Sequence, residues 1–167
     1  MAYYIFREIT TYLYGIPMSY KGRFHPKEPS KYLGNPQNII YRSWLEYRFM
    51  SYLDRHPNVM NWASEELAIP YISPVDNRRH RYFVDFFIRY KNSKQEIEEK
   101  LVEIKSSQQC KAPTLKEGAH WKQKRRYARE LATWSINQAK WQAAEQYANK
   151  QGWNFTVLTE KDLSAYK

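Results

Sequence analysis

A chain of 167 residues is long enough to bury the core of one domain, so its length does not call for a second one. Its 27 lysines and arginines outnumber its 17 aspartates and glutamates, giving a formal net charge of +10. This charge points to a polyanionic partner and favours nucleic acid over an acidic membrane. The sequence has no long apolar run and no secretory leader, so we expect a soluble, intracellular protein that does not bind membranes.

The cysteine and histidine content limits the kinds of metal site. The single cysteine, Cys110, excludes an internal disulfide and a cysteine-based zinc site. The 4 histidines are too scattered along the sequence to suggest a local set of ligands. Any metal ion is therefore expected to bind to carboxylates.

The first part of the chain predicts an irregular segment and then a helix. Residues 1–38 hold many aromatic residues, glycines and prolines, and we interpret them as an irregular N-terminal arm with one short helix near Tyr4–Leu13. Between Tyr41 and His56 the apolar residues recur at helical spacing, and Pro57 follows as a stop. We expect the folded domain to comprise residues 39–167.

The middle of the chain predicts strands. Segments Glu66–Ile72 and Arg81–Tyr90 have strand character and are joined through a turn at 74–77. A third strand is predicted at Glu98–Ser106. The short polar stretch before it predicts that the second and third strands form an antiparallel hairpin.

The last part of the chain predicts a loop, two helices and a strand. A loop over 108–118 leads to a basic helix at about Trp121–Ala132. A further helix is predicted to be capped by Asn137 and to end near Gly152, and a short strand follows at Asn154–Leu158. The predicted fold class is α/β (α+β), with a mixed central sheet flanked by helices.

Asp85 interrupts an otherwise apolar strand. Phe83 and Phe87 would share its face, which indicates that this face is covered. A buried, unpaired aspartate is costly, and ionisable groups in such positions concentrate at functional sites. These considerations favour a functional Asp85 over an ordinary solvent-facing residue of an edge strand.

The strand after it ends in Glu103-Ile104-Lys105. Alternation places Glu103 and Lys105 on one face of that strand. If the two strands are neighbours, Asp85 and Glu103 offer hard oxygen ligands to Mg²⁺ or Mn²⁺, with Lys105 close enough to act on a substrate. Glu103 and Lys105 alone would indicate no more than a salt bridge. The combination with Asp85 favours metal-dependent phosphodiester cleavage.

Glu46 is a third candidate acid. It lies beside the apolar stripe of the first predicted helix, with Arg42 as a helical neighbour. Two interpretations have equal weight. Glu46 forms a surface ion pair with Arg42, or the helix leans on the sheet so that Glu46 joins Asp85 and Glu103 around a metal ion.

The predicted basic helix fits contact with DNA. It spreads positive charge around its circumference with aromatic residues in between, which suits phosphate contact and stacking on unpaired bases. The alternative is a solvated basic helix without a ligand. Arg78, Arg79 and Arg81 would extend the same positive surface. The candidate DNA-binding residues are Lys122, Lys124, Arg125, Arg126, Arg129 and Lys140.

The order of these residues resembles a known superfamily. A helix with Glu46, then Asp85, then Glu103-Ile104-Lys105 is similar to the PD-(D/E)XK nucleases, which implies a restriction-endonuclease-like core. Val84 stands where that superfamily usually has proline. More specifically, the chain from about Lys31 onward resembles the head completion nucleases of tailed bacteriophages, and endonucleases that cut at transposon ends share the layout. This likeness is carried by Tyr32 to Asn38, Tyr41-Arg42-Ser43, Trp62 with Glu65, Ile69-Pro70-Tyr71, Arg81 to Asp85, Ser135-Ile136-Asn137 and Lys140-Trp141.

The resemblance implies roles for the site residues. Glu46, Asp85 and Glu103 would be metal-binding acids, and Lys105 the catalytic lysine. With the backbone carbonyl of Ile104, they would bind one or two Mg²⁺ (or Mn²⁺) ions. Asn137 and Lys140 would lie near the active site.

The resemblance also implies a biological role. It predicts a metal-dependent DNA endonuclease that trims or processes packaged DNA during phage head completion, in the host cytoplasm, with association with the virion left open. Expected partners are DNA and phage head or neck proteins. The sequence does not decide between monomer and homodimer, nor between DNA ends, overhangs, nicks and branches. Two alternatives remain: a structural DNA-binding head or neck protein that does not cleave, and a sequence-tolerant nucleic-acid-binding module.

Overall fold

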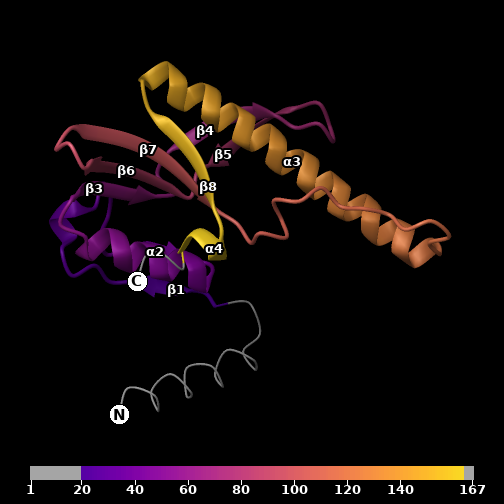
Figure 1. Ribbon diagram of the computed structural model, residues 1–167, viewed down its shortest axis with the longest axis horizontal. Coiled ribbons are helices and arrows are strands. Elements are labelled where there is room, and N and C mark those ends of the chain that lie inside the picture. Colours follow the sequence, from indigo (N-terminus) through magenta and orange to yellow (C-terminus); the bar gives the residue numbers. More distant parts are fainter. Residues whose placement is uncertain (1–19, 164–167) are drawn as a thin grey trace, which may run out of the picture.

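The computed structural model describes residues 20–163 and is built around a mixed four-stranded sheet (Figure 1). Across the sheet the order is β3 (Val59–Ser64), β6 (Phe86–Lys91), β7 (Ile97–Ile104) and β8 (Asn154–Leu158). The first three strands pair antiparallel, whereas β8 runs parallel to β7. The predicted mixed sheet, the hairpin of β6 and β7 and the final strand are confirmed.

Helix α2 (Trp44–Arg55) covers one face of the sheet, as the helical pattern predicted. Its Phe49, Met50 and Leu53 are buried in one cluster with Val102 and Ile104 of β7. The short helix α4 (Glu160–Leu163) lies on the same side and adds Leu163 to this core.

Helix α3 (Trp121–Gln151) covers the other face of the sheet with its C-terminal half. Ala144 and Ala148 are fully buried there and pack in a second cluster with Leu101 of β7. Successive residues of β7 thus face opposite cores, as strand geometry requires. The N-terminal half of α3 and the loop that leads to it extend beyond the sheet (Figure 1).

A two-stranded ribbon packs against α3. It consists of β4 (Ala68–Ile72) and β5 (Arg79–Phe83), paired antiparallel. Its buried residues Ile69, Tyr71 and Tyr82 join the core under α3. The expected turn between the two strands is confirmed, with the N–H of Asn77 donating to the carbonyl of Ser73 at 2.9 Å.

Two helices predicted in the last part of the chain are one. Asn137 does not cap a helix but lies in the middle of α3, where it is 8% exposed. No glycine or proline occurs between Trp121 and Gln151, so nothing in this stretch stops a helix once it has begun. The predicted end is confirmed, since Gly152 has the left-handed φ of 74° that favours glycine after a helix.

One strand predicted at Arg81–Tyr90 is two. The chain leaves β5 after Phe83 and enters β6 at Phe86, so the alternation is reset at Val84-Asp85. As a result Phe83 is 43% exposed, and Val84 lies on the same side as Phe87, both against the core under α3. The expectation that Phe83 lies on a covered face was therefore wrong.

Strand β3 was not predicted, because its alternation of buried and exposed residues is interrupted. A bulge between Val59 and Asn61 shifts its register against β6, and Trp62 and Ala63 are both buried although they are consecutive. A sequence with such a bulge does not show the alternation of a regular strand.

The segment predicted to be irregular is partly ordered. Within its described residues, β1 (Gly22–Phe24) pairs antiparallel with β2 (Ile39–Tyr41), and a 3₁₀ turn, η1, spans Pro29–Lys31. Phe24 and Tyr32 are buried in the core under α2. The helix predicted near residues 4–13 lies outside the described residues.

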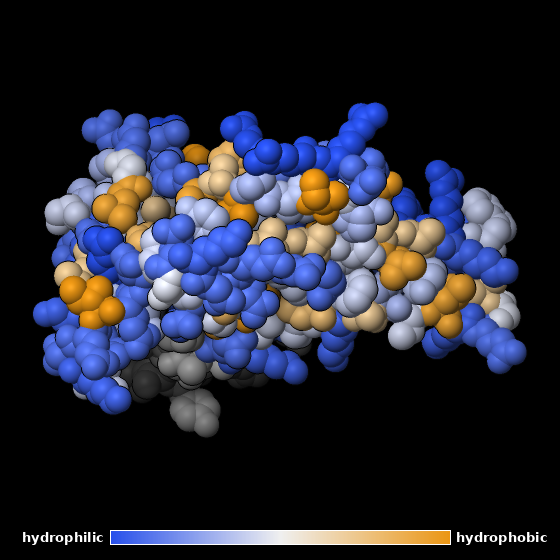
Figure 2. Space-filling model, turned by 90° about the horizontal axis from the view of Figure 1, so that it is seen from above, coloured by the Kyte–Doolittle hydropathy of each residue, from blue (hydrophilic) through white to orange (hydrophobic). Residues whose placement is uncertain are grey.

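The surface agrees with the composition. The face in Figure 2 is mostly hydrophilic, with separate hydrophobic side chains between the polar ones. None of the helices within residues 20–163 is both long enough and apolar enough to cross a membrane.

Candidate active site

Asp85 lies at the break between β5 and β6, beside the end of β7. Its Oδ2 accepts a hydrogen bond from the backbone N–H of Ile104 at 2.8 Å. Its own carbonyl accepts from the N–H of Glu65 at 3.2 Å, so the backbone is held as well. The structure therefore brings the first predicted acid to the Glu-Ile-Lys segment.

Glu103 is the more buried of the two acids, with only 3% of the residue exposed. Its Oε2 accepts a hydrogen bond from the hydroxyl of Tyr82. Its Oε1 lies 2.7 Å from the ammonium nitrogen of Lys105. A charge this buried is tolerable only when such partners replace its water.

The ammonium of Lys105 is surrounded by three oxygen atoms. Besides Glu103 Oε1, its Nζ lies 3.8 Å from Asp85 Oδ2 and donates to the carbonyl oxygen of Ile104 at 3.2 Å. The backbone N–H of Lys105 donates to the carbonyl of Leu158 at 3.0 Å, so strand β8 fixes the residue. Lys105 thus binds all three groups that we predicted as metal ligands at the end of the hairpin.

The charges in this cluster shift one another's proton affinities. Burial, and then the negative charge of Glu103, raise the pKa of Asp85 well above its usual range, against the opposing effect of Lys105. Burial lowers the pKa of Lys105, but Asp85 and Glu103 outweigh that effect, and the net pKa of Lys105 is raised. Two close carboxylates therefore need a cation, and Lys105 supplies it.

Glu46 lies at the start of α2 and closes its first turn. Its Oε2 accepts from the backbone N–H of Arg42 at 2.7 Å, and its Oε1 accepts from the hydroxyl of Ser43 at 3.0 Å. The Ser43 hydroxyl in turn accepts from the Glu46 N–H at 3.1 Å and so caps the N-terminus of α2. The negative charge of Glu46 also makes a smaller contribution to the raised pKa values of Asp85 and Lys105.

The alternative ion pair between Arg42 and Glu46 does not form. The guanidinium of Arg42 pairs instead with Glu65, in the turn that precedes β4. Glu65 has a positive φ of 55° and is tied to the Asp85 backbone, so Arg42 and Glu65 border the site. Sequence reasoning did not propose Arg42 as a site residue. No local pattern pairs it with an acid so distant in sequence.

Tyr82 was also missed. It is 3% exposed and is anchored between the core under α3 and Glu103. Burial, and then the negative charge of Glu103, raise the pKa of Tyr82, so its hydroxyl stays protonated and donates. The sequence signal that could have identified Tyr82 was its position shortly before Asp85, on a strand that was predicted.

The predicted basic residues fall in two places. Lys140 lies against the ribbon, with its ammonium 5.6 Å from the centre of the Tyr82 ring and 5.8 Å from that of Tyr71. The others are exposed on the extended half of α3, where Arg126 pairs with Glu130 at 3.4 Å: Lys122, Lys124, Arg125, Arg126 and Arg129. The structure brings only Lys140 toward the acids.

The donor atoms fit a divalent cation, although the acids do not converge as a ready-made cage. Within residues 20–163 no group of three or more histidine, cysteine, aspartate or glutamate side chains is close enough together to hold a metal ion. Asp85, Glu103 and the Ile104 carbonyl nevertheless already surround a positive charge. Carboxylate and carbonyl oxygens are the ligands that Mg²⁺ prefers.

Comparison with known proteins assigns the class. A model of the family described as TnsA-like endonuclease N terminal matches residues 56–160, which include β3 to β8 with Asp85 and Lys105. That match covers more than half of the chain, and the chain belongs to this family of endonucleases. The restriction-endonuclease-like fold class that the sequence resemblance implied is thereby confirmed.

A curated relative narrows the comparison. The chain is 38% identical over 148 residues to a protein of Enterobacteria phage T4 named head completion nuclease. The alignment covers 89% of this chain and 96% of that protein. The resemblance to the head completion nucleases and to the transposon-end endonucleases is confirmed.

Proposed function

We propose that this protein is a metal-dependent DNA endonuclease that trims or processes packaged DNA during phage head completion. The observation that carries the chemistry is the convergence of Asp85, Glu103 and the Ile104 carbonyl on the Lys105 ammonium. The relative's name, head completion nuclease, supports the biological role. The nuclease family supports phosphodiester cleavage, and the oxygen donors support the metal.

The acids would hold one or two Mg²⁺ or Mn²⁺ ions. Asp85, Glu103 and the Ile104 carbonyl supply the ligands, and Glu46 adds negative charge from the start of α2 or binds a second ion. A bound divalent ion supplies positive charge where the pentacoordinate phosphorus develops negative charge. Tyr82 and the Ile104 N–H keep the two carboxylates in place before substrate arrives.

Lys105 acts on the attacking water and on the phosphate. Its ammonium is close to both acids and retains its proton in this cluster, because the pKa of Lys105 is raised. It can orient the water and offset charge on the phosphate oxygens. The basic face of α3, with Lys122, Lys124, Arg125, Arg126 and Arg129, would contact DNA phosphates outside the site, and Lys140 would do so nearer to it.

The proposed setting is the host cytoplasm, with phage head or neck proteins as partners. A monomer cuts one strand at a time, whereas a homodimer would place two sites on one duplex. Gel filtration with light scattering, with and without DNA, distinguishes the two states.

The function is tested by cleavage. Linear duplex, overhang-bearing and branched DNA are incubated with Mg²⁺ or Mn²⁺ and, separately, with EDTA. We expect cutting that needs the metal and is lost in Asp85→Asn and in Lys105→Ala. Asp76→Asn is the matched control, since Asp76 is exposed and pairs with His80 in the ribbon turn. Intact DNA in every lane, with DNA binding retained, would instead support a structural DNA-binding head protein.

A further inference from the structure

The ribbon of β4 and β5 has an exposed face that the proposed site does not use. One face, with Ile69, Tyr71 and Tyr82, is buried against α3. The opposite face presents alternate residues of both strands, which the register sets side by side: Ala68 with Phe83, Pro70 with Arg81, and Ile72 with Arg79. Ile72 is 55% exposed and Phe83 is 43% exposed.

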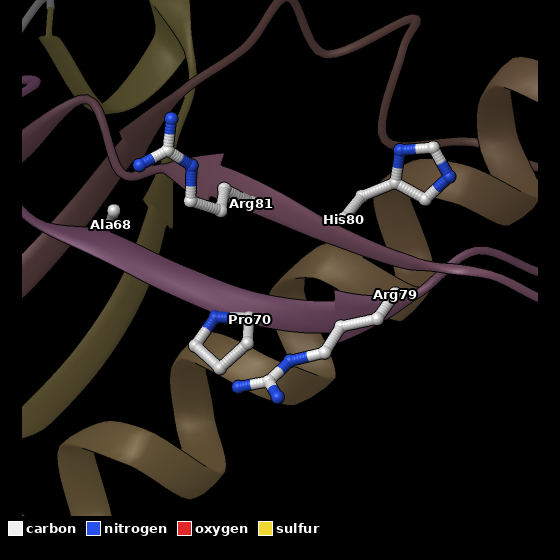
Figure 3. A pocket seen from close by; sticks show the side chains of 5 residues that line it. All are labelled: Ala68, Pro70, Arg79, His80 and Arg81. Atoms are coloured by element: carbon white, nitrogen blue, oxygen red, sulfur yellow. The ribbon is translucent and has the colours of Figure 1, made fainter.

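The two arginines of this face are free to bind a ligand. Arg79 and Arg81 are exposed, and within the described part of the chain neither forms an ion pair, unlike Arg42, Arg89 and Arg126. With Pro70 they line a shallow hollow of about 400 Å³ (Figure 3). Residues two apart on a strand are about 6.7 Å apart, so the two guanidinium groups can contact successive positions of an extended ligand.

Phe83 continues the same face toward the acids. The guanidinium of Arg81 lies 5.6 Å from the centre of the Phe83 ring. Only Val84 separates Phe83 from Asp85, a span of at most about 7 Å of extended chain. Because the Phe83 ring is exposed to water, it contributes little to the packing of a hydrophobic core.

We infer that this face binds an unpaired DNA strand and leads it to the site, with Arg79 and Arg81 on phosphates and Phe83 stacked on a base. Basic side chains next to an aromatic ring on one surface are the chemistry of single-strand binding, because guanidinium groups track the backbone while a ring accepts any base. A base within a duplex is already stacked between its neighbours, so it cannot stack on the Phe83 ring. The inference rests on the proposed function and narrows it to DNA with an overhang or a frayed end.

The experiment measures binding without cutting. Fluorescence anisotropy in EDTA compares a labelled duplex that carries a single-stranded overhang with a blunt duplex of the same sequence. Phe83→Leu is expected to weaken binding of the overhang DNA by about 5- to 150-fold, as loss of one stacked base does, and to leave the blunt duplex within twofold. Phe83→Tyr keeps the ring and is expected to bind as the wild type does.

The arginines are tested through salt dependence. Arg79→Ala with Arg81→Ala is expected to reduce the slope of log affinity against log salt on the overhang DNA by about 1.4, since each lost single-strand phosphate contact changes it by about 0.7. The matched control is Lys91→Ala with Lys94→Ala. This variant removes the same charge at the turn of the β6–β7 hairpin, which is the end of the hairpin that lies away from the site. Circular dichroism confirms that each variant is folded.

The outcomes separate this inference from the proposed function. Overhang binding unchanged by Phe83→Leu, or weakened equally for both DNAs, overturns the stacking role. A slope change no larger than that of the lysine control overturns the phosphate role. If the DNA is never cut with Mg²⁺ but both binding effects appear, the ribbon inference stands and the nuclease proposal fails.

Discussion

The Oδ2 atom of Asp85 accepts a hydrogen bond at 2.8 Å from the backbone N–H of Ile104. The ladder between β6 and β7 ends at Phe86 and Val102, so beyond it the Ile104 N–H meets a side chain rather than another strand. One bond thereby fixes the distance between the first acid and the segment that carries the second. The break in the strand at Val84-Asp85 is what makes this contact available.

Tyr82→Phe tests whether the tyrosine positions Glu103. The change removes only the hydroxyl that donates to Glu103, and the ring keeps its packing. We expect the Mg²⁺ concentration for half-maximal cleavage to rise by about 10- to 100-fold, as is typical when a partner of a metal ligand is lost. Cleavage is titrated with Mg²⁺ at fixed DNA concentration.

Tyr71→Phe is the control for Tyr82→Phe. Tyr71 packs in the same cluster, and among the described residues its hydroxyl forms no hydrogen bond with Glu103. Its titration should match that of the wild type. Equal shifts in the two variants would mean that tyrosine hydroxyls in this core affect cleavage in a general way and that Tyr82 has no special role.

Lys105→Met should separate metal affinity from cleavage. The ammonium competes with a divalent ion for Asp85, Glu103 and the Ile104 carbonyl. Without it, we expect Mn²⁺ to bind at least about tenfold more tightly, or about 1.4 kcal/mol, while cleavage is lost. Calorimetry with Mn²⁺ alone measures the affinity. Lys100→Met, which removes a lysine of the same strand that lies over Tyr90, should leave both properties unchanged.

Ala144→Leu tests the close approach of α3 to the sheet. Ala144 is fully buried between α3 and the strands, so a larger side chain forces the layers apart. We expect a loss of about 1–3 kcal/mol in the free energy of unfolding, measured with urea. Ala128→Leu, on the exposed and extended half of the same helix, should change stability by less than about 0.5 kcal/mol.

Gln95→Gly should stabilise the β6–β7 hairpin. Gln95 has a left-handed φ of 66° and lies in the exposed turn. Glycine adopts this conformation without the strain of a side chain, and we expect a gain of about 0.5–1 kcal/mol. Lys94→Gly, which is next to it and has no positive φ, should instead lose stability. A loss in both variants would show that the turn is unstrained.

Lys124→Ala with Arg125→Ala tests the extended half of α3. If both contact duplex phosphates, the slope of log affinity against log salt should decrease in magnitude by about 1.8, or about 0.9 for each contact. Binding is measured in EDTA on blunt duplex. Arg55→Ala with Lys150→Ala removes equal charge from exposed positions at the ends of α2 and α3 and is the comparison. If the two double variants have identical slopes, the N-terminal half of α3 is a solvated helix that does not contact DNA.

The elements that sequence predicted well are those with an unbroken period or a strong boundary. Helix α2 shows a regular apolar stripe, a serine cap and a proline after its end. In β7, Val102 and Ile104 face one core and Leu101 faces the other. The pairing of Asp85 with the Glu-Ile-Lys segment followed because a short polar turn leaves only a hairpin.

The errors share one cause, which is that tertiary contacts decide where an element stops. Asn137 favours a cap locally, but no glycine or proline interrupts α3 there, and Ile136 and Ala139 on either side of Asn137 pack against the core under the helix. The bulge in β3 and the break at Val84-Asp85 are stabilised by neighbouring strands that a local pattern does not contain. The same holds for Tyr82 and Arg42, whose partners are distant in sequence.

The parallel pairing of β8 with β7 has a consequence for biosynthesis. The backbone of Lys105 is held by Leu158, so the lysine that completes the site is fixed by a strand that is translated after all the acids of the site. A nascent chain that has not reached this strand leaves β7 as an open edge, and the backbone N–H of Lys105 lacks its partner. The support of Lys105 by β8 is thus in place only once that strand has been translated and has paired with β7.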